Sequence, residues 1–374
     1  MIDGKVAVAI VGCGGMGGGH AVAISTGSGQ ALWMTDGSKG RDLLPGDTDL
    51  TKKMVLAGTF DVKEERQQWA RNQGFHTYNS FEEVLADDAV DAVLVATPND
   101  SHKDLSIRAM RAGKHVLCEK PVMMNSKDLE DVLAVAEETG MKFYPRQNRR
   151  WDKDYLTMKK IYDEKLIGDV FHIETRSHGS RGIPGDWRGR KAQGGGMMFD
   201  WGVHLLDRLV LMVPEKITKV YAKMTHVTND EVDDGFIMFV TFANGVTATV
   251  EVGTCHFITL PQWYMTGTQG SASINGFNDP GRMVLLKDWA DKDATPILAG
   301  EGLTKTMAPR GANSTEELPL PEFEYDRNEL YSNLCDVILG KAEQVVKNEQ
   351  ALRILRLMEA ALESDAKGVA IDFE

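Results

Sequence analysis

Short apolar runs separated by helical spacing organise the first third of the chain. Each run is continuous rather than alternating, which is typical of strands covered on both faces of a parallel sheet. The runs are residues 6–11, 54–60, 92–96 and 115–118. Helical periodicity fills the intervals, at residues 63–72, 81–85 and 102–112. This alternation predicts a doubly wound α/β domain over residues 1–147.

From residue 168 onward, apolar and polar positions alternate within each expected strand. Two β-rich runs between residues 235 and 255 flank Ala243-Asn244-Gly245, and Asn-Gly is a strong hairpin signal. The pattern predicts a large, open, mostly antiparallel sheet with a few helices. We therefore expect a second, α+β domain over residues 148–374, which would bind the substrate and mediate assembly.

In the last part of the chain we expect a long surface segment followed by two helices. Residues 288–325 are rich in Pro, Gly, Thr and charged residues, which indicates a long surface segment. Helical spacing returns at about residues 327–339 and 348–364, and the second of these helices has an apolar face. We expect both helices to pack back on the first domain.

Length and charge limit the possible partners. A chain of 374 residues exceeds the usual size of one hydrophobic core, which agrees with two domains. The formal net charge of −13 would repel phosphate backbones, and no Lys/Arg cluster offsets it locally. Nucleic acid is therefore not an expected partner.

Membrane insertion and secretion are not indicated either. The apolar run at residues 6–11 is too short for the apolar region of a signal peptide. No apolar stretch approaches the roughly 20 residues needed to cross a bilayer. The four cysteines show no CxxC spacing, so neither a disulfide framework nor a zinc site is predicted. A cytoplasmic location is the expectation.

A GxGxxG motif directly follows the first expected strand and precedes a helix. Its glycines are Gly12, Gly14 and Gly17, with Gly15 and Met16 inside the motif. In a dinucleotide-binding loop these glycines allow a tight turn, close approach of a pyrophosphate, and close packing of the helix. The motif predicts a cofactor site at the helix N-terminus, where N–H groups are free to bind an anion. A glycine-rich turn without a ligand is the alternative for the motif taken alone.

An acidic residue at the end of the second strand usually binds the ribose hydroxyls of the cofactor. Asp61 ends the better second strand, and Asp36 is the fallback, so residues 29–53 are interpreted as an insertion. A carboxylate at this position would repel a 2′-phosphate, which favours NAD over NADP. Lys63 and Arg66 follow shortly after, and their positive charges would instead favour the 2′-phosphate of NADP.

Two loops leave the next two strands at the sheet edge where open α/β sheets bind ligands. The first loop contains Thr97, Pro98, Asn99 and His102, and the second is Glu119-Lys120-Pro121. A lysine held there among cations or apolar walls could bind a substrate hydroxyl. A solvated lysine at the rim is the alternative.

A glycine triplet introduces the third motif, for which we expect a helix over residues 197–209. On such a helix Asp200 and His204 would lie one turn apart on one face, with Asp207 further along. A carboxylate next to an imidazole is suited to proton transfer. The alternative is a helix that pairs its own charges.

The order of these motifs, from GxGxxG through EKP to DxGxHxxD, resembles the Gfo/Idh/MocA family of oxidoreductases. The resemblance covers nearly the whole chain and implies a Rossmann domain that binds NAD, followed by a substrate domain. It assigns the catalytic set to Lys120, Asp200 and His204. It also places Thr97, Pro98, Asn99, His102 and Glu119 along the cofactor.

The reaction that this resemblance implies is oxidation of a secondary hydroxyl on a sugar-like ring. His204 would take the hydroxyl proton, Lys120 would polarise the oxygen, and Asp200 would orient both the substrate and the imidazole. Further polar and aromatic candidates for substrate binding are Asn148, Arg149 and Trp187. We favour a pyranose or glycoside, with the C3 hydroxyl as the expected position.

Several alternatives remain open at this level. They are an inositol or other cyclic polyol dehydrogenase, a glycoside hydrolase that uses bound NAD transiently, and a non-catalytic NAD-binding sensor. The nine histidines include no HxxxH or HxH pair, so no metal is predicted. A homo-oligomer, as a dimer, tetramer or higher assembly, is expected, and the insertion at residues 29–53 could act as an arm between subunits.

Overall fold

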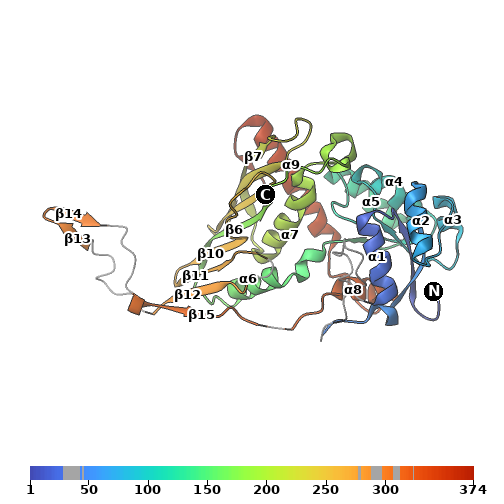
Figure 1. Cartoon of the computed structure of the whole chain (residues 1–374), viewed down its shortest axis with the longest axis horizontal. Coiled ribbons are helices and arrows are strands. Elements are labelled where there is room, and N and C mark those ends of the chain that lie inside the picture. The colour runs from blue at the N-terminus through green and yellow to red at the C-terminus, as the bar shows by residue number, and fades with distance from the viewer. Residues whose placement is uncertain (28–42, 44–45, 277–278, 288–296, 306–311, 323) are drawn as a thin grey trace.

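The computed structural model describes residues 1–27, 43, 46–276, 279–287, 297–305, 312–322 and 324–374 (Figure 1). The described chain contains two large sheets, each with its own helices. The first sheet is parallel and the second is mostly antiparallel, so the predicted fold class is confirmed. No helix within the described ranges is both long and apolar enough to span a membrane.

The first sheet has the strand order β2-β1-β3-β4-β5. Its strands are β1 (Val6–Val11), β2 (Met54–Phe60), β3 (Ala92–Val95), β4 (His115–Cys118) and β5 (Phe143–Pro145). The helices that accompany them are α1 (Gly15–Thr26), α2 (Glu64–Asn72), α3 (Phe81–Ala86), α4 (His102–Arg111) and α5 (Ser126–Thr139). Every residue of β1 is buried, because helices cover both faces of the sheet.

The order of the second sheet is β15-β12-β11-β10-β6-β9-β8-β7-β16. The strands at its centre are β6 (Val170–His178), β7 (Ile217–Thr225), β8 (Gly235–Phe242), β9 (Thr247–Gly253) and β10 (Trp263–Gly267). Those toward its edges are β11 (Gly270–Ile274), β12 (Arg282–Leu286), β15 (Thr315–Leu318) and β16 (Ile371–Asp372). Among the described strand pairs of this sheet, β6 and β9 are parallel and the others are antiparallel.

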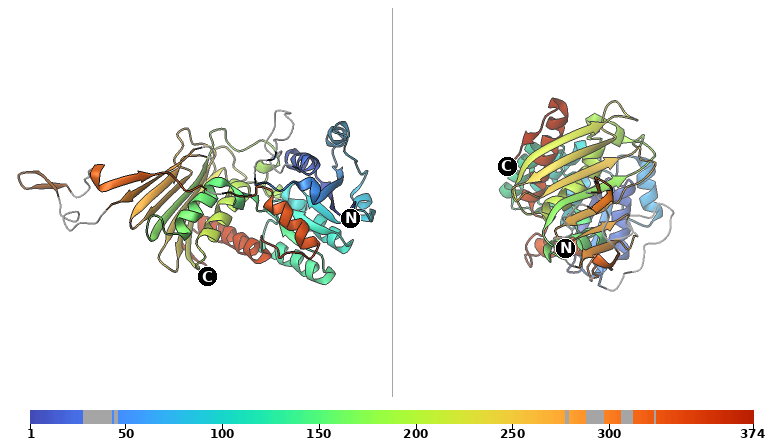
Figure 2. Two further views of the ribbon diagram at one scale, coloured as in Figure 1. Left: turned by 90° about the horizontal axis from the view of Figure 1, so that it is seen from below. Right: turned by 90° about the vertical axis from the view of Figure 1, so that its left-hand side faces the viewer.

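Buried and exposed residues alternate along β7, so one face of the second sheet carries the core. The helices on that face include α6 (Lys153–Asp163), α7 (Val203–Met212) and α9 (Asn348–Lys367). The right-hand view of Figure 2 shows the other face, on which no described helix lies.

The expected surface segment at residues 288–325 contains strands in its described part. Residues 315–318 form β15, which pairs with β12 at the sheet edge. Before it, β13 (Ile297–Gly300) and β14 (Leu303–Lys305) form a hairpin that projects from the body of the molecule (Figure 1). Composition did not indicate this edge strand, Thr-Glu-Glu-Leu, because three of its four residues are polar.

The last two helices return toward the first domain. Leu330 and Leu334 of α8 (Glu329–Ile338) pack in one core with Val8 of β1. Helix α9 lies against both α5 and β7, and therefore spans the boundary between the two sheets.

Most of the interpreted insertion at residues 29–53 lies outside the described residues, and so does Asp36. Its described end is tied to the segment before α8. The Thr48 hydroxyl donates to Asp326 at 2.6 Å, and Arg327 forms an ion pair with Asp47.

Candidate active site

The glycine loop has the shape that a bound dinucleotide requires. Gly12 has a φ of +90°, and a Cβ there would lie 2.7 Å from the Ala96 carbonyl. A Cβ on Gly17 would lie 1.7 Å from the Gly12 oxygen. At Gly14, by contrast, a Cβ would meet nothing within 4 Å. Two glycines therefore permit packing, and the third leaves open space beside the N-terminus of α1, where an anion is favoured.

Asp61 follows β2 and touches this loop. One carboxylate oxygen accepts a hydrogen bond from the Cys13 N–H at 2.6 Å, and the other accepts from the Lys63 N–H at 2.8 Å. The carboxylate thus lies beside the glycine loop, where the ribose of a cofactor bound by α1 would be. Its role as the ribose ligand stays a prediction.

The two loops at the sheet edge are joined by a buried histidine. The ring nitrogens of His102 lie 2.9 Å from the Thr97 carbonyl and 3.0 Å from the Pro121 carbonyl. The Ser101 hydroxyl also donates a hydrogen bond to the Thr97 hydroxyl at 2.6 Å. Because the His102 side chain is fully buried, it fixes the relative position of the loops that flank the predicted cofactor path.

Asn99 connects this edge to the second domain. Its side-chain N–H donates to the Gly194 carbonyl at 2.8 Å, at the start of the glycine triplet. The neighbouring Pro98 precedes the single turn η3 (Asn99–Ser101). The loop that would line the cofactor is therefore also in contact with the segment that leads to Asp200.

Behind Lys120 lies a buried polar network that the sequence analysis did not predict. Glu119 contacts His20 at 2.7 Å and Arg146 at 2.9 Å, and its other oxygen accepts from the Lys120 N–H at 3.0 Å. Burial alone would raise the pKa of Glu119, but Arg146, His20 and Lys120 outweigh it and lower that pKa. Glu119 therefore stays ionised and holds the lysine backbone in place.

The same network reaches α8. Nδ1 of His20 lies 2.6 Å from the Tyr331 hydroxyl. Burial, together with the charge of Arg146, lowers the pKa of His20 to about 4, so its imidazole is neutral at neutral pH. The residues come from α1, from the ends of β4 and β5, and from α8, and only their convergence in space reveals them.

Lys120 and Asp200 meet across the two domains. The ammonium donates to the Asp200 carboxylate at 2.6 Å and to the Asp200 backbone carbonyl at 2.7 Å. Arg188 approaches the same carboxylate at 3.4 Å. Burial would raise the pKa of Asp200, but the charges of Lys120 and Arg188 prevail and lower it. Asp200 is therefore an ionised acceptor at neutral pH.

His204 lies next to this pair and is nearly buried. Its pKa is lowered well below the ordinary value, first by burial and then by the charges of Lys120, Arg149 and Arg208. Its Nδ1 has no hydrogen-bond partner among the described residues, so Asp200 does not hold the imidazole as expected. The neutral ring can accept a proton at neutral pH.

The segment that carries both residues is not a regular α-helix, which corrects the prediction for residues 197–209. Met198–Gly202 form a π-helix (η7), and α7 begins only at Val203. Regular side-chain spacing could not indicate this widened turn. It is capped from a distant loop, because the Asp233 carboxylate accepts from the Met198 N–H at 2.8 Å.

Asp207 has a structural role rather than a place in the site. Both of its carboxylate oxygens accept from Arg150, at 2.6 and 2.8 Å, and both residues are buried. The ion pair links α7 to the single turn η4 (Asn148–Trp151). Asp207 is therefore separated in function from Asp200 and His204.

Two of the predicted substrate residues, Arg149 and Trp187, lie near His204 and Asp200 through one intervening side chain each. The Arg149 guanidinium lies 4.5 Å from the centre of the Trp201 ring, which in turn packs edge-on against His204. Trp187 stacks with Arg188 at 4.7 Å. The Asn148 side-chain oxygen is buried and lacks a partner among the described residues. Arginines and indole rings here suit a hydroxylated ring with an apolar face.

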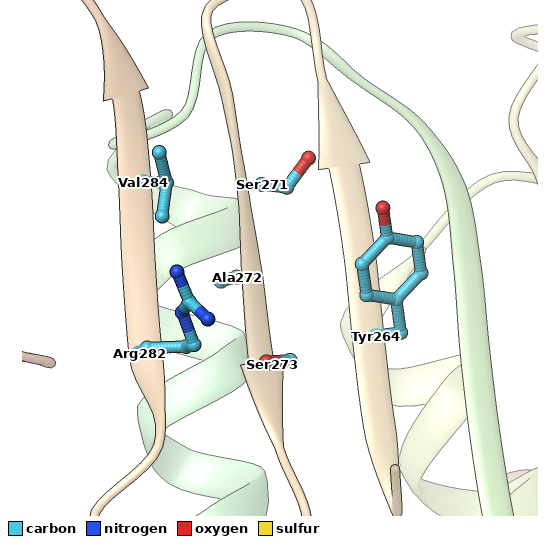
Figure 3. Close-up of a pocket in the computed structure, with 6 residues that line it drawn as sticks. All are labelled: Tyr264, Ser271, Ala272, Ser273, Arg282 and Val284. Carbon is cyan, nitrogen blue, oxygen red and sulfur yellow. The ribbon is translucent and has the colours of Figure 1, made fainter. Parts of the chain in front are cut away.

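A separate hollow lies on the open face of the second sheet, away from these residues. Figure 3 shows its lining, which includes Tyr264, Ser271 and Arg282 from three neighbouring strands. None of the predicted site residues contributes to it.

Two family models match the chain. One describes an oxidoreductase family with an NAD-binding Rossmann fold and matches residues 6–146. The other describes the GFO/IDH/MocA C-terminal domain and matches residues 155–273. Fold, site and matches together define a two-domain, NAD-binding oxidoreductase. The chain belongs to the Gfo/Idh/MocA family, as the order of its motifs predicted.

Similar proteins support the same class. The solved structure of an NAD-binding protein from Listeria innocua has a TM-score of 0.83 and 40% identity, covering 98% of this chain and 97% of that chain. A scyllo-inositol 2-dehydrogenase (NADP(+)) of Bacillus subtilis is 25% identical and covers 79% of this chain and 82% of its own length. A 1,5-anhydro-D-fructose reductase of Ensifer adhaerens is 31% identical, over 51% of this chain and 59% of its own length. The expectation of an NAD(P)-dependent oxidoreductase is thereby confirmed.

Proposed function

We propose that this enzyme oxidises a secondary hydroxyl of a sugar or glycoside, with the C3 hydroxyl of a pyranoside as the favoured position. One observation carries the proposal: the Lys120 ammonium is bonded to the Asp200 carboxylate at 2.6 Å, beside a neutral, buried His204. A cation from the first domain is thus in contact with an acceptor from the second, and a base that feels the same cation follows the acceptor by four residues.

Each residue has a distinct task in this reaction. A lysine ammonium has three donors, of which the bonds to Asp200 use two, so the third can reach the oxygen of the reacting hydroxyl. The cation stabilises negative charge that develops on this oxygen. His204 accepts the hydroxyl proton, and Asp200 accepts a hydrogen bond from a neighbouring hydroxyl of the ring. A bound nicotinamide would supply the hydride acceptor.

NAD is the cofactor that we favour over NADP. The open space at Gly14 fits a pyrophosphate, and the Asp61 carboxylate is fixed beside the loop by two backbone N–H groups. A fixed negative charge at this place disfavours a 2′-phosphate. The relative from Bacillus subtilis is named for NADP, so both cofactors belong in the test.

The test is the formation of NADH absorbance with a panel of free pyranoses, methyl glycosides and inositols, each with NAD and with NADP. We expect the highest kcat/KM with a pyranose or glycoside and NAD. A 3-deoxy analogue should be inert although it binds, while a 4-deoxy analogue reacts. Turnover of the 3-deoxy sugar would refute the assignment of the C3 position.

A cyclic polyol is the second candidate substrate, favoured by the name of the relative that acts on scyllo-inositol. Its ring carbons all bear hydroxyls, so Asp200 could accept a hydrogen bond from the neighbouring hydroxyl of either substrate. A kcat/KM for an inositol that exceeds those of all sugars in the panel would decide for the polyol.

We further infer a cytoplasmic homo-oligomer. All four cysteines are unpaired, which suits a reducing compartment. Tyr221 and Phe239 are exposed by 39% and 47% on the helix-free face of the second sheet, where a second copy could cover them. Sedimentation analysis of the wild type and of Phe239→Glu tests this, because a monomeric wild type contradicts it.

A further inference from the structure

Three side chains with metal-binding donor atoms converge at one end of the second sheet, on its helix-free face. They are His178 at the end of β6, Glu251 in β9 and His256 in the turn after β9. The parallel register places His178 opposite Gly253, two residues beyond Glu251. The chain then turns back, and the His256 N–H donates to the Gly179 carbonyl at 2.8 Å. Strand pairing therefore creates a cluster that linear spacing does not show.

The distances within the cluster are close to those of a metal site. Nε2 of His178 lies 3.4 Å from one Glu251 oxygen, and Nε2 of His256 lies 3.9 Å from the other. All three donor atoms lie within 4.8 Å of one another. Ligand atoms on a tetrahedral zinc ion, with bonds of about 2.0–2.1 Å, are roughly 3.3 Å apart. Binding of one ion by both imidazoles would require the partly exposed His256 ring to turn out of its stacked position against His178.

A buried imidazole nitrogen faces the carboxylate of the cluster at a distance longer than a good hydrogen bond. The His178 side chain is only 2% exposed, and its Nε2 has no hydrogen-bond partner among the described residues. This atom faces Glu251. The Leu260 N–H approaches the other ring nitrogen at 3.5 Å, a long contact that is given up when Nε2 binds a cation and Nδ1 carries the proton. Metal binding would thus exchange this long contact at Nδ1 for a bond at Nε2.

The surrounding residues hold the donors in place. Arg176 donates to the Glu251 oxygen that faces His178, at 2.9 Å, and this fixes the carboxylate while the second oxygen points toward His256. The two imidazoles stack with ring centres 3.9 Å apart and planes inclined by 8°. A Cβ on Gly253 would lie 2.2 Å from the His256 ring, so glycine is required for the ring to lie here.

We propose that His178, Glu251 and His256 bind one divalent transition-metal ion of the zinc class, with water as the fourth ligand. Two imidazoles and one carboxylate suit Zn²⁺, whereas Ca²⁺ and Mg²⁺ prefer oxygen ligands. The ion would cross-link the ends of β6 and β9 where the segment carrying Trp187 and Arg188 begins. It would be structural and would take no part in hydride transfer.

The test is metal titration of the untagged full chain after dialysis against a chelator. We expect saturable uptake of about one equivalent of Zn²⁺ or Co²⁺, with the visible absorbance of tetrahedral cobalt. His256→Ala and Glu251→Gln should each weaken binding at least about 10-fold. His256 is partly exposed, and glutamine keeps the shape of Glu251, so neither change opens the core.

His172→Ala is the matched control. His172 lies on β6 and on the same face, but it contacts Thr247 instead of the cluster. This variant should bind metal like the wild type, and Zn²⁺ should raise the Tm of the wild type and of His172→Ala but not of the two ligand variants. Absence of saturable binding, or equal affinity and equal Tm shifts in all four proteins, overturns the proposal.

Discussion

The two sheets differ in how they contribute to the site. The five-stranded sheet is covered by helices on both faces, and it contributes to the site through the loops at its edge. The nine-stranded sheet is covered on one face, and it supports the site through η7, which a distant loop caps. The cofactor half is thus shaped mainly by backbone and glycine geometry, whereas the catalytic half depends on side-chain links between remote segments. Substitutions in the two halves should therefore lower stability, NAD affinity or catalytic rate for different physical reasons.

The largest effect is expected at the junction of the halves. Lys120→Ala and His204→Ala should each lower kcat by about 100- to 10,000-fold, because each removes a group that assists proton transfer or stabilises charge. Rates measured by NADH formation, with folding checked by circular dichroism, test this. Lys127→Ala, an exposed lysine on α5, is the control and should leave kcat unchanged. Near-normal turnover of either site variant would refute its catalytic role.

In the cofactor half, added side chains at glycines are expected to crowd the backbone or the cofactor, and so to lower stability or NAD affinity. Gly17→Ala should cost about 3 kcal/mol of unfolding free energy or more, since its Cβ would lie 1.7 Å from the Gly12 oxygen. Gly14→Ala should keep the wild-type stability, because its Cβ meets open space, but should bind NAD weakly. Urea unfolding and NAD titration separate these outcomes. Equal NAD affinity of Gly14→Ala and wild type would show that the pyrophosphate lies elsewhere.

The catalytic half depends on the Asp233 cap, which predicts a pH effect. Burial raises the pKa of Asp233 to about 6 from its ordinary value of 3.8. Between these values the native state holds a proton that the unfolded state has released, so stability falls as pH rises. Relative to Asp233→Asn, the wild type should lose up to about 3 kcal/mol between roughly pH 4 and pH 6. Parallel stability curves for the two proteins would contradict this explanation.

The smallest effect is expected in the network behind Lys120. Tyr331→Phe leaves Nδ1 of the buried His20 without its partner and should cost about 1–2 kcal/mol of unfolding free energy. Because Glu119 still holds the Lys120 backbone, kcat should change little. Urea unfolding and rate measurements test both statements. A drop in kcat above 10-fold would mean that the network does more than support the fold.

Much of this arrangement could be predicted from local patterns. Continuous apolar runs predicted the strands β1 to β4, and Asn244-Gly245 predicted the β8–β9 hairpin. The order of motifs predicted the family. These features depend on residues that are close in sequence, such as the glycines around Gly14. They can therefore be predicted without knowing which distant segments are in contact.

Other features could not be predicted. The partnership of Glu119 with His20 and Tyr331, the Asp233 cap and the cluster at His178 all join segments far apart in the chain. The π-helical turn at Asp200 also went unpredicted, because one widened turn leaves no separate mark in side-chain spacing. Asp207 has the same spacing as a site residue would have, yet it pairs with Arg150.

The sequence by itself determined the two-domain architecture, the glycine loop and the residue types available for chemistry, because strand periodicity and glycine geometry are local properties. Only the tertiary structure decided that Lys120 faces Asp200, that His204 is neutral, and that His178 meets His256. Those outcomes depend on burial and on charges brought together through space, and the electrostatic energy of a group is set by all its neighbours rather than by its place in the chain.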